Sequence, residues 1–167
     1  VNPVQTKVLY QQVADFAALT GAERVVDAYC GTGTIALALA KDAGEVWGIE
    51  SEPSAVADAE INAKLNLLDH VQFLLGRVEE RLPKMVREGL SPDVVVLDPP
   101  RKGCDPTVID AIVQAQPRRV VYVSCNPATL ARDLGLFAAN GYQTRQVRPV
   151  DMFPQTAHVE AVALLTS

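Results

Sequence analysis

One cysteine in this sequence lies where a thiol could act as a nucleophile. Cys125 follows the apolar, β-branched run 120–123, which is typical of a buried strand. Asn126 and Pro127 then favour the start of a helix, because asparagine is a good N-cap and proline suits the first helical position. The positive end of a helix stabilises a thiolate, which is the reactive form of the side chain. Taken alone, Cys125 fits a small buried hydrophobic residue better, so its chemistry depends on neighbours from elsewhere in the chain.

A glycine-rich turn suggests a binding site for a nucleoside. The strand expected at 24–30 leads into Gly31 and Gly33, and a helix rich in Ala and Leu follows through Ala40. Glycines let the backbone approach a ligand closely, and Glu50, at the tip of the next strand, is placed to accept hydrogen bonds from ribose hydroxyls. The spacing Gly31-x-Gly33-x-x-Ala36 also fits a loose dinucleotide fingerprint. An NAD-dependent oxidoreductase therefore remains an alternative to other nucleoside cofactors at this point.

A carboxylate followed by two prolines ends another expected strand. In Asp98-Pro99-Pro100-Arg101 the prolines hold the backbone rigid, so the carboxylate and nearby carbonyls keep a defined position. Such a loop could accept a hydrogen bond from an N–H on the edge of a planar base. A simple structural turn explains the motif equally well when it is considered alone.

The elements that must position these residues alternate along the chain. This pattern predicts an α/β fold, with a doubly wound parallel sheet and right-handed crossovers. The expected strands cover 24–30, 45–49, 71–75, 93–97, 119–124, 142–150 and 159–165, and the expected helices cover 3–19, 34–40, 53–67, 79–88, 106–116 and 127–140.

The last two strands are joined too closely for a parallel crossover, which needs a dozen or more residues. We therefore expect strand 159–165 to run antiparallel, so that Glu160 at its start reaches the edge that carries Gly31, Glu50, Asp98 and Cys125. Ligands of open α/β sheets bind at that edge.

Three later blocks of the sequence together resemble the signature motifs of the RNA (uracil-5-)-methyltransferases. The blocks are Asp98-Pro99-Pro100-Arg101-Lys102-Gly103, Ser124-Cys125-Asn126-Pro127-x-Thr129 and 151–160 (DMFPQTAHVE). Asp27-x-Tyr29-Cys30-Gly31-x-Gly33 is similar to the S-adenosylmethionine (SAM) loop of the same family. The resemblance covers essentially the whole chain and is nearest to the branch that modifies bacterial ribosomal RNA.

The resemblance implies a Rossmann-like class I SAM-dependent methyltransferase that modifies uridine in RNA, without a metal. It implies Cys125 as the nucleophile, Glu160 as the base that removes the C5 proton, and Asp98 as a contact of both uracil and cofactor. The implied cofactor-binding residues are Asp27, Tyr29, Gly31, Gly33, Thr34, Glu50 and Asp98.

The sequence also departs from the family pattern. A Phe-x-Gln motif and the domains that bind RNA, which in some members hold an iron–sulfur cluster, would precede Val1 and are absent from this sequence. Residues 1–167 are therefore expected to be a catalytic domain from the C-terminal part of a longer protein. Arg77 stands where an Asp or Asn would contact adenine, which puts the adenine pocket in question. A SAM-binding module that is inactive in isolation and an RNA cytosine-5 methyltransferase stay open as alternatives.

Composition limits the remaining possibilities. The net charge is −5, and all of this excess lies in residues 1–90, whereas residues 91–167 are balanced. The basic residues of the second half could form a phosphate-facing surface or could be scattered, solvated charges, and composition does not decide between the two. They are Arg101, Lys102, Arg118, Arg119, Arg132, Arg145 and Arg148. Three cysteines without a C-x-x-C pair argue against a disulfide framework and a zinc site, and favour a reducing, cytoplasmic setting. No apolar run is long enough for a membrane span, and the oligomeric state is left open.

Overall fold

The expected alternation of strands and helices is present in the computed structural model, which describes residues 3–152 and 159–167. The helices are α1 (Pro3–Ala17), α2 (Thr34–Ala40), α3 (Pro53–Leu65), α4 (Val78–Arg87), α5 (Pro106–Ala115) and α6 (Pro127–Ala139). The strands are β1 (Arg24–Ala28), β2 (Glu45–Glu50), β3 (Val71–Leu75), β4 (Val94–Leu97), β5 (Arg119–Ser124), β6 (Gln143–Val150) and β7 (Glu160–Thr166).

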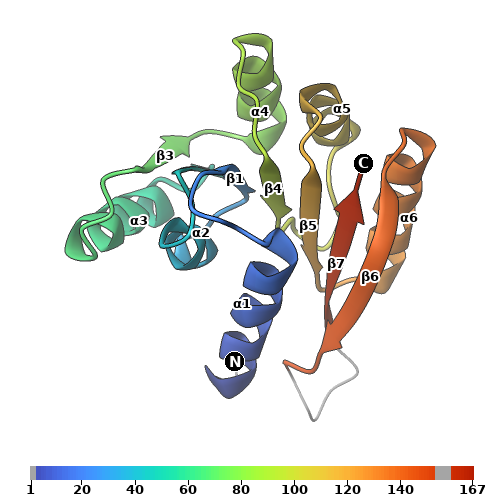
Figure 1. The fold of residues 1–167 in the computed structure, drawn as a ribbon, viewed down its shortest axis with the longest axis horizontal. Coiled ribbons are helices and arrows are strands. Elements are labelled where there is room, and N and C mark those ends of the chain that lie inside the picture. The colour runs from blue at the N-terminus through green and yellow to red at the C-terminus, as the bar shows by residue number, and fades with distance from the viewer. Residues whose placement is uncertain (1–2, 153–158) are drawn as a thin grey trace.

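Within the described residues the strands form one sheet in the order β3-β2-β1-β4-β5-β7-β6 (Figure 1). The first five strands are parallel, and β7 runs antiparallel to both β5 and β6. The predicted reversal of the last strand is therefore confirmed. The strand order reverses between β1 and β4, and loops at such a switch point enclose the ligand crevice of open α/β sheets.

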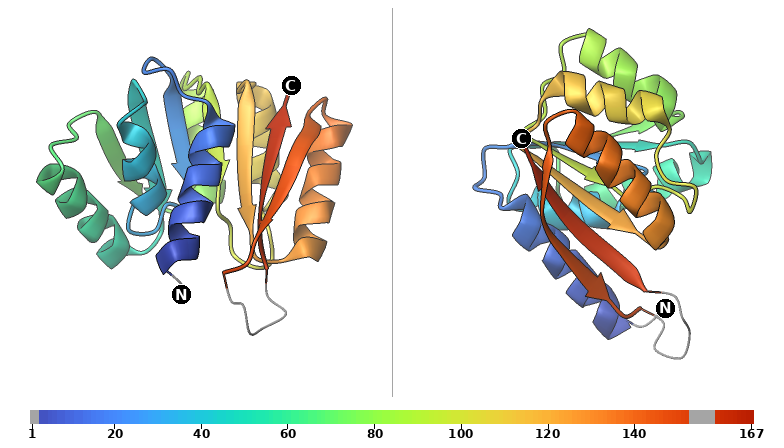
Figure 2. Two further views of the ribbon diagram at one scale, coloured as in Figure 1. Left: turned by 60° about the horizontal axis from the view of Figure 1, so that its bottom comes forward. Right: turned by 90° about the vertical axis from the view of Figure 1, so that its right-hand side faces the viewer.

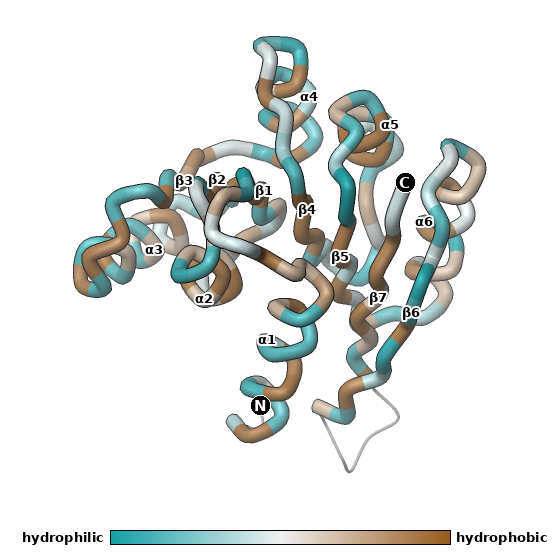
Figure 3. Tube along the Cα trace, viewed as in Figure 1, coloured by the Kyte–Doolittle hydropathy of each residue, from teal (hydrophilic) through white to brown (hydrophobic). Residues whose placement is uncertain are grey.

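Helices cover both faces of the sheet (Figure 2). One hydrophobic core lies under α1, α2 and α3, and the second lies under α4, α5 and α6. Successive residues of a strand point to opposite faces, so Val121 packs in the first core and Tyr122 in the second. The central strands are therefore apolar on both faces, whereas the edge strand β6 is mostly hydrophilic and exposed (Figure 3).

Several element boundaries differ from the sequence-based expectation. The first strand ends at Ala28 because Tyr29 turns into the left-handed region at φ 63°. Helix α3 ends at Leu65, and Leu67 also has a positive φ. Pro83 lies inside α4 and not in its first turn, although a proline removes one helical hydrogen bond. Packing of Val78 and Leu82 in the second core keeps this helix continuous.

In the described part of the chain, no helix is both long and apolar enough to cross a lipid bilayer. The same residues contain no group of three or more His, Cys, Asp or Glu side chains that could hold a metal ion.

Candidate active site

Cys125 lies in a tight turn between β5 and α6. The Asn126 amide donates a hydrogen bond to Ser124 Oγ (3.0 Å), and that hydroxyl donates to the Asn126 carbonyl (3.0 Å). The Asn126 side chain in turn accepts from the amides of Ala128 (3.0 Å) and Thr129 (3.4 Å). The predicted N-cap is therefore confirmed, and the thiol, which is half-buried, remains accessible beside the start of the helix.

Strand pairing delivers Glu160 to the same edge. Ser124, the last residue of β5, is paired with Ala161 of the antiparallel strand β7. Cys125 and Glu160 are the next residues along these two strands, so they emerge at the same end of the β5–β7 pair. Glu160 is half-buried, and burial raises the pKa of its carboxyl. A carboxyl with a raised pKa accepts a proton more readily at neutral pH.

Asp98 joins this group from the end of β4. Its carboxyl is accessible to solvent, yet the surrounding protein raises its pKa to about 7, with a further contribution from the negative charge of Glu160. Asp98 follows Leu97, which pairs with Tyr122 of β5, so Asp98 lies at the same end of the sheet as Ser124 and Cys125. The structure therefore brings Asp98, Cys125 and Glu160 to one edge of the sheet, as the sequence predicted.

The raised pKa of Asp98 makes a prediction about stability. Between the ordinary value of 3.8 and about 7, the folded protein holds a proton on Asp98 that the unfolded chain has lost. Stability should therefore fall as the pH rises through this window. Without ligand, the free energy of unfolding of Asp98→Asn minus that of the wild type should be about 1 kcal/mol larger at pH 8 than at pH 4. We expect no larger value, because solvent access to the carboxyl reduces the effect. Urea unfolding of both proteins across this pH range measures the difference.

Asp105→Asn is the matched control, because Asp105 is an exposed N-cap whose pKa is lowered by hydrogen bonds from Thr107. Asparagine is an equally good N-cap, and a lowered pKa gives the opposite pH trend. If Asp98→Asn shows no pH-dependent gain, the carboxyl does not hold its proton in the folded protein.

Beside these residues lies a cavity of about 430 Å³ at the switch point between β1 and β4. Its lining residues are Tyr29, Glu50, Ser51, Arg77, Val78, Glu79, Asp98, Pro100, Lys102, Gly103 and Asp105. Tyr29, Glu50 and Asp98 are the predicted cofactor residues among them. Ser51, Val78, Glu79 and Asp105 were not selected from the sequence, because their meeting in one cavity depends on how the sheet and its helices pack.

The predicted glycine turn is bonded to Glu50, which lines this cavity. The Gly31 amide donates to Glu50 Oε1 (3.1 Å), and the Glu52 amide donates to Glu50 Oε2 (2.8 Å). Gly33 is also constrained by packing, whereas its predicted approach to a ligand stays a prediction. It has φ 85°, and a Cβ there would lie 2.9 Å from the Phe73 ring. Gly33 is thus required by packing against β3.

Thr34 begins α2, and its hydroxyl accepts a hydrogen bond from Tyr10 (3.0 Å). This contact ties α1 to the glycine turn. Sequence reasoning did not identify Tyr10, because the two residues are distant along the chain.

Asp27 lies beneath the turn and is 1% exposed. In the described part of the chain neither of its carboxylate oxygens has a hydrogen-bond partner. Burial raises its pKa well above the ordinary value, and the charge of Asp98 raises it further. The Ala36 amide lies close enough to oppose this shift but does not meet the geometry of a hydrogen bond. Buried carboxyls without partners are costly, so Asp27 marks a place where a cationic or hydrogen-donating ligand group would be favourable.

Arg77 lies at the cavity wall and is paired with acidic residues of α4. Its guanidinium contacts the carboxylates of Glu79 and Glu80. Glu79 also lines the cavity. The Asp or Asn expected at position 77 is therefore replaced by an Arg77–Glu79 pair, in which the acidic group comes from the following helix.

The basic residues of the second half do not form one surface. Arg119 starts β5 and is paired with Thr166 at the end of β7, and Arg145 bonds to the Thr166 hydroxyl (2.7 Å). These residues lie at the end of the sheet opposite Ser124. Arg101 and Lys102, by contrast, belong to the loop that follows Asp98. The expectation of a single phosphate-facing surface is therefore wrong, because the whole length of β5 separates Arg119 and Arg145 from Arg101 and Lys102.

The third signature block is described only at its ends. Asp151, Met152, Val159 and Glu160 are placed, whereas residues 153–158 lie outside the described residues.

Comparison with known proteins identifies relatives over nearly the whole chain. The family model of the tRNA (uracil-5-)-methyltransferases matches residues 4–167. A protein from Enterococcus faecalis, named only as an RNA methyltransferase, is 59% identical over 99% of this chain, and one from Clostridium acetobutylicum is 51% identical over 99%. The chain spans 36% of the length of each of these two relatives.

Solved structures agree with these matches. The Pyrococcus abyssi tRNA (uracil-54, C5)-methyltransferase, solved in complex with S-adenosyl-L-homocysteine, is 32% identical with a TM-score of 0.83. The match covers 99% of this chain and 39% of that protein. An rRNA methylase from Streptococcus thermophilus, at 14% identity and a TM-score of 0.70, shares the fold.

Proposed function

This chain belongs to the tRNA (uracil-5-)-methyltransferase family, and from that premise we propose that it methylates C5 of a uridine in RNA with SAM as methyl donor. The observation that carries the proposal is the meeting of Cys125, Glu160 and Asp98 at one edge, beside a cavity lined by Tyr29 and Glu50. We further propose that residues 1–167 are the catalytic domain of a longer protein, since the relatives named above are nearly three times as long.

The residues of the cavity fit SAM. The ligand carries a positively charged sulfonium and an ammonium group, and the carboxyls of Glu50, Glu79, Asp98 and Asp105 line the cavity. Glu50, at the tip of β2, is placed to hold the ribose hydroxyls. When bound, SAM supplies an electrophilic methyl group.

Cys125 performs the first step in this proposal. C5 of uracil is a poor nucleophile, so the Cys125 thiolate adds to C6 and forms an S–C6 bond. The electrons of the C5–C6 double bond move toward O4 as an enolate. C5 would then take the methyl group as its bond to the SAM sulfur breaks, which leaves S-adenosyl-L-homocysteine. The turn at Ser124–Asn126 holds Cys125 at the N-terminus of α6, next to the end of β5. Covalent catalysis of this kind divides one difficult step into easier ones.

Glu160 completes the reaction. After methylation C5 still carries its proton, and a base must remove it before the thiolate can leave. The Glu160 carboxylate takes this proton, the C5–C6 double bond forms again, and the S–C6 bond breaks. Its raised pKa suits it to this role. Asp98, in its deprotonated form, accepts from the uracil N3–H, which favours uracil over cytosine because cytosine N3 carries no proton.

The target uridine must leave its base stack to reach this edge, at a cost of about a few kcal/mol. We propose that the longer protein supplies the surface that binds RNA, because residues 1–167 are acidic overall and their basic residues are divided between two ends of the sheet.

Ribosomal RNA is the proposed substrate on the strength of the signature blocks at 98–103 and 124–129. Mass spectrometry of rRNA and tRNA incubated with the longer protein and SAM would identify the modified RNA. Methylation of tRNA alone would contradict the ribosomal assignment.

The cofactor assignment gives a direct prediction. Calorimetry should show that this chain binds SAM and S-adenosyl-L-homocysteine, whereas NAD should give no heat above dilution. The acidic cavity explains the difference, because NAD would place its pyrophosphate among the carboxylates of Glu50, Asp98 and Glu79. Binding of NAD without SAM would overturn the proposed function. Binding of SAM without methylation, even by the longer protein, would favour the alternative of an inactive SAM-binding module.

A further inference from the structure

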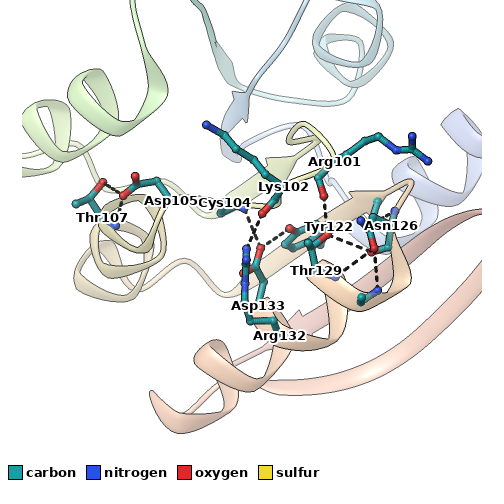
Figure 4. Close-up of polar contacts among 12 residues, drawn as sticks. Arg101, Lys102, Cys104, Asp105, Thr107, Tyr122, Asn126, Thr129, Arg132 and Asp133 are labelled. Atoms are coloured by element: carbon teal, nitrogen blue, oxygen red, sulfur yellow. Dashed lines mark hydrogen bonds and ion pairs between the residues drawn. The ribbon is translucent and has the colours of Figure 1, made fainter.

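The loop that follows Asp98 is attached to helix α6 by several hydrogen bonds. Thr129 Oγ1 donates to the Arg101 carbonyl (2.9 Å), and Arg132 Nη2 donates to the Lys102 carbonyl (2.7 Å). The Cys104 amide donates to Asp133 Oδ2 (2.8 Å). Thr129, Arg132 and Asp133 are spaced so that they share one face of α6, and Figure 4 shows this face turned toward the loop.

Asp133 is the centre of these contacts and is fully buried, at 0% exposure. Its Oδ2 also accepts from the Tyr122 hydroxyl (2.5 Å), and its Oδ1 accepts from Arg132 Nε (3.0 Å). A buried carboxylate is stable only when its lone pairs are satisfied. Asp133 is therefore bonded to β5, to its own helix and to the loop, and these three bonds restrict movement of the loop relative to α6.

The fit between loop and helix leaves no room for a side chain at position 103. Gly103 has φ 80°, and a Cβ there would lie 2.5 Å from Arg132 Nη2 and 2.7 Å from Asp133 Oδ2. The loop thus lies directly against the buried carboxylate.

The loop and helix α6 each connect directly to the active site. Asp98 precedes the loop, and Pro100, Lys102, Gly103 and Asp105 line the cavity. Cys125 precedes α6, whose first turn contains Thr129. The loop also affects Tyr29, which lines the cavity. Burial is the main reason that the pKa of Tyr29 is raised, and the neighbouring Cys104 thiol raises it further. One face of α6 therefore fixes the cavity wall relative to the nucleophile.

We propose that Asp133, together with Arg132 and Thr129, positions the Asp98 loop and the Cys125 turn as one rigid unit, which sets the distance between the cofactor cavity and the nucleophile. These residues act through the loop and do not touch the substrate. The inference rests on the proposed function, but the rigid unit itself can be measured without activity.

The test uses the full-length protein and two substitutions. Thr129→Val removes the hydroxyl that donates to the carbonyls of Arg101 (2.9 Å) and Asn126 (3.3 Å). Asp133→Asn keeps the shape of the side chain but replaces one acceptor oxygen with an NH2 group. Thr144→Val on β6 and Asp58→Asn on α3 are the controls, since both positions are exposed and distant from the loop in the sequence. Hydrogen exchange followed by mass spectrometry measures peptides that cover 99–105. Calorimetry measures SAM affinity, and single-turnover kinetics measures the rate of methyl transfer at saturating SAM.

Thr129→Val should speed exchange in the loop and weaken SAM binding by about fivefold, and Asp133→Asn should do so by about 10- to 100-fold. Methyl transfer should slow in both variants even at saturating SAM, and the two controls should match the wild type. Loop exchange, SAM affinity and transfer rate that stay unchanged in Thr129→Val would overturn the proposal, even if Asp133→Asn fails to fold. A lower melting temperature with unchanged loop exchange would also overturn it.

The two hypotheses fail in different ways. If the wild-type protein binds SAM but methylates no uridine, the proposed function fails, and loop exchange and SAM affinity still test the rigid unit. If the wild type is active and the variants keep its transfer rate, the positioning role alone is wrong.

Discussion

Cys125→Ala should abolish methylation and reduce turnover by about 10⁴-fold or more, since loss of the nucleophile removes the covalent route altogether. SAM should still bind, because Cys125 does not line the cavity. The wild-type protein should form a covalent complex with RNA that contains 5-fluorouridine, because fluorine at C5 cannot be removed as a proton is. The complex should be visible as a shifted band on a denaturing gel, and it should be absent for Cys125→Ala.

Cys30→Ala is the matched control for this experiment. Cys30 is buried, and burial raises the pKa of its thiol, so it should not react. The Cys30→Ala protein should therefore form the covalent complex as the wild type does. A complex that survives Cys125→Ala would show that another residue is the nucleophile.

Glu160→Gln should separate methyl transfer from product release. The amide has nearly the shape of the carboxyl but cannot take the C5 proton, so the methylated uridine should remain bound to Cys125. Turnover should fall by about 10²- to 10⁴-fold, the usual contribution of a general base. With ordinary uridine RNA and SAM, a covalent complex should accumulate to near the amount of enzyme. Gel analysis and mass spectrometry of the trapped peptide measure this directly.

The double variant Cys125→Ala with Glu160→Gln should form no complex, which confirms that the trapped species is attached to Cys125. Glu79→Gln provides a second comparison, because Glu79 lines the cavity but belongs to α4, away from the β5–β7 pair. It should alter SAM affinity without trapping RNA. Unchanged turnover in Glu160→Gln would remove its role as the base.

Much of the site could be predicted because the relevant signals are local. A side chain that caps a helix acts on amides two or three residues away, so Asn126 and Pro127 identified the turn at Cys125 from the sequence alone. The length of the connection before Glu160 was enough to predict an antiparallel last strand, which the structure confirms. Alternation of apolar segments was likewise enough for the α/β class.

Other features depend on contacts between segments that are distant in the sequence. The sequence did not indicate that Gly33 packs against the ring of Phe73 on β3. It grouped Arg101 with Arg119 and Arg145, whereas the direction of β5 places them at opposite ends of the sheet. Neither result can be read from spacing, because each depends on which strands become neighbours.

The sequence by itself determined the fold class, the strand ends that carry Asp98 and Cys125, and the family to which the chain belongs. Only the tertiary structure decided that β7 lies between β5 and β6, that Glu160 affects the pKa of Asp98, and that Asp133 on α6 holds the loop at 101–104. The physical reason is the range of the forces involved. Capping and periodicity act over a few residues, whereas burial and carboxylate interactions depend on every element that packs around the group.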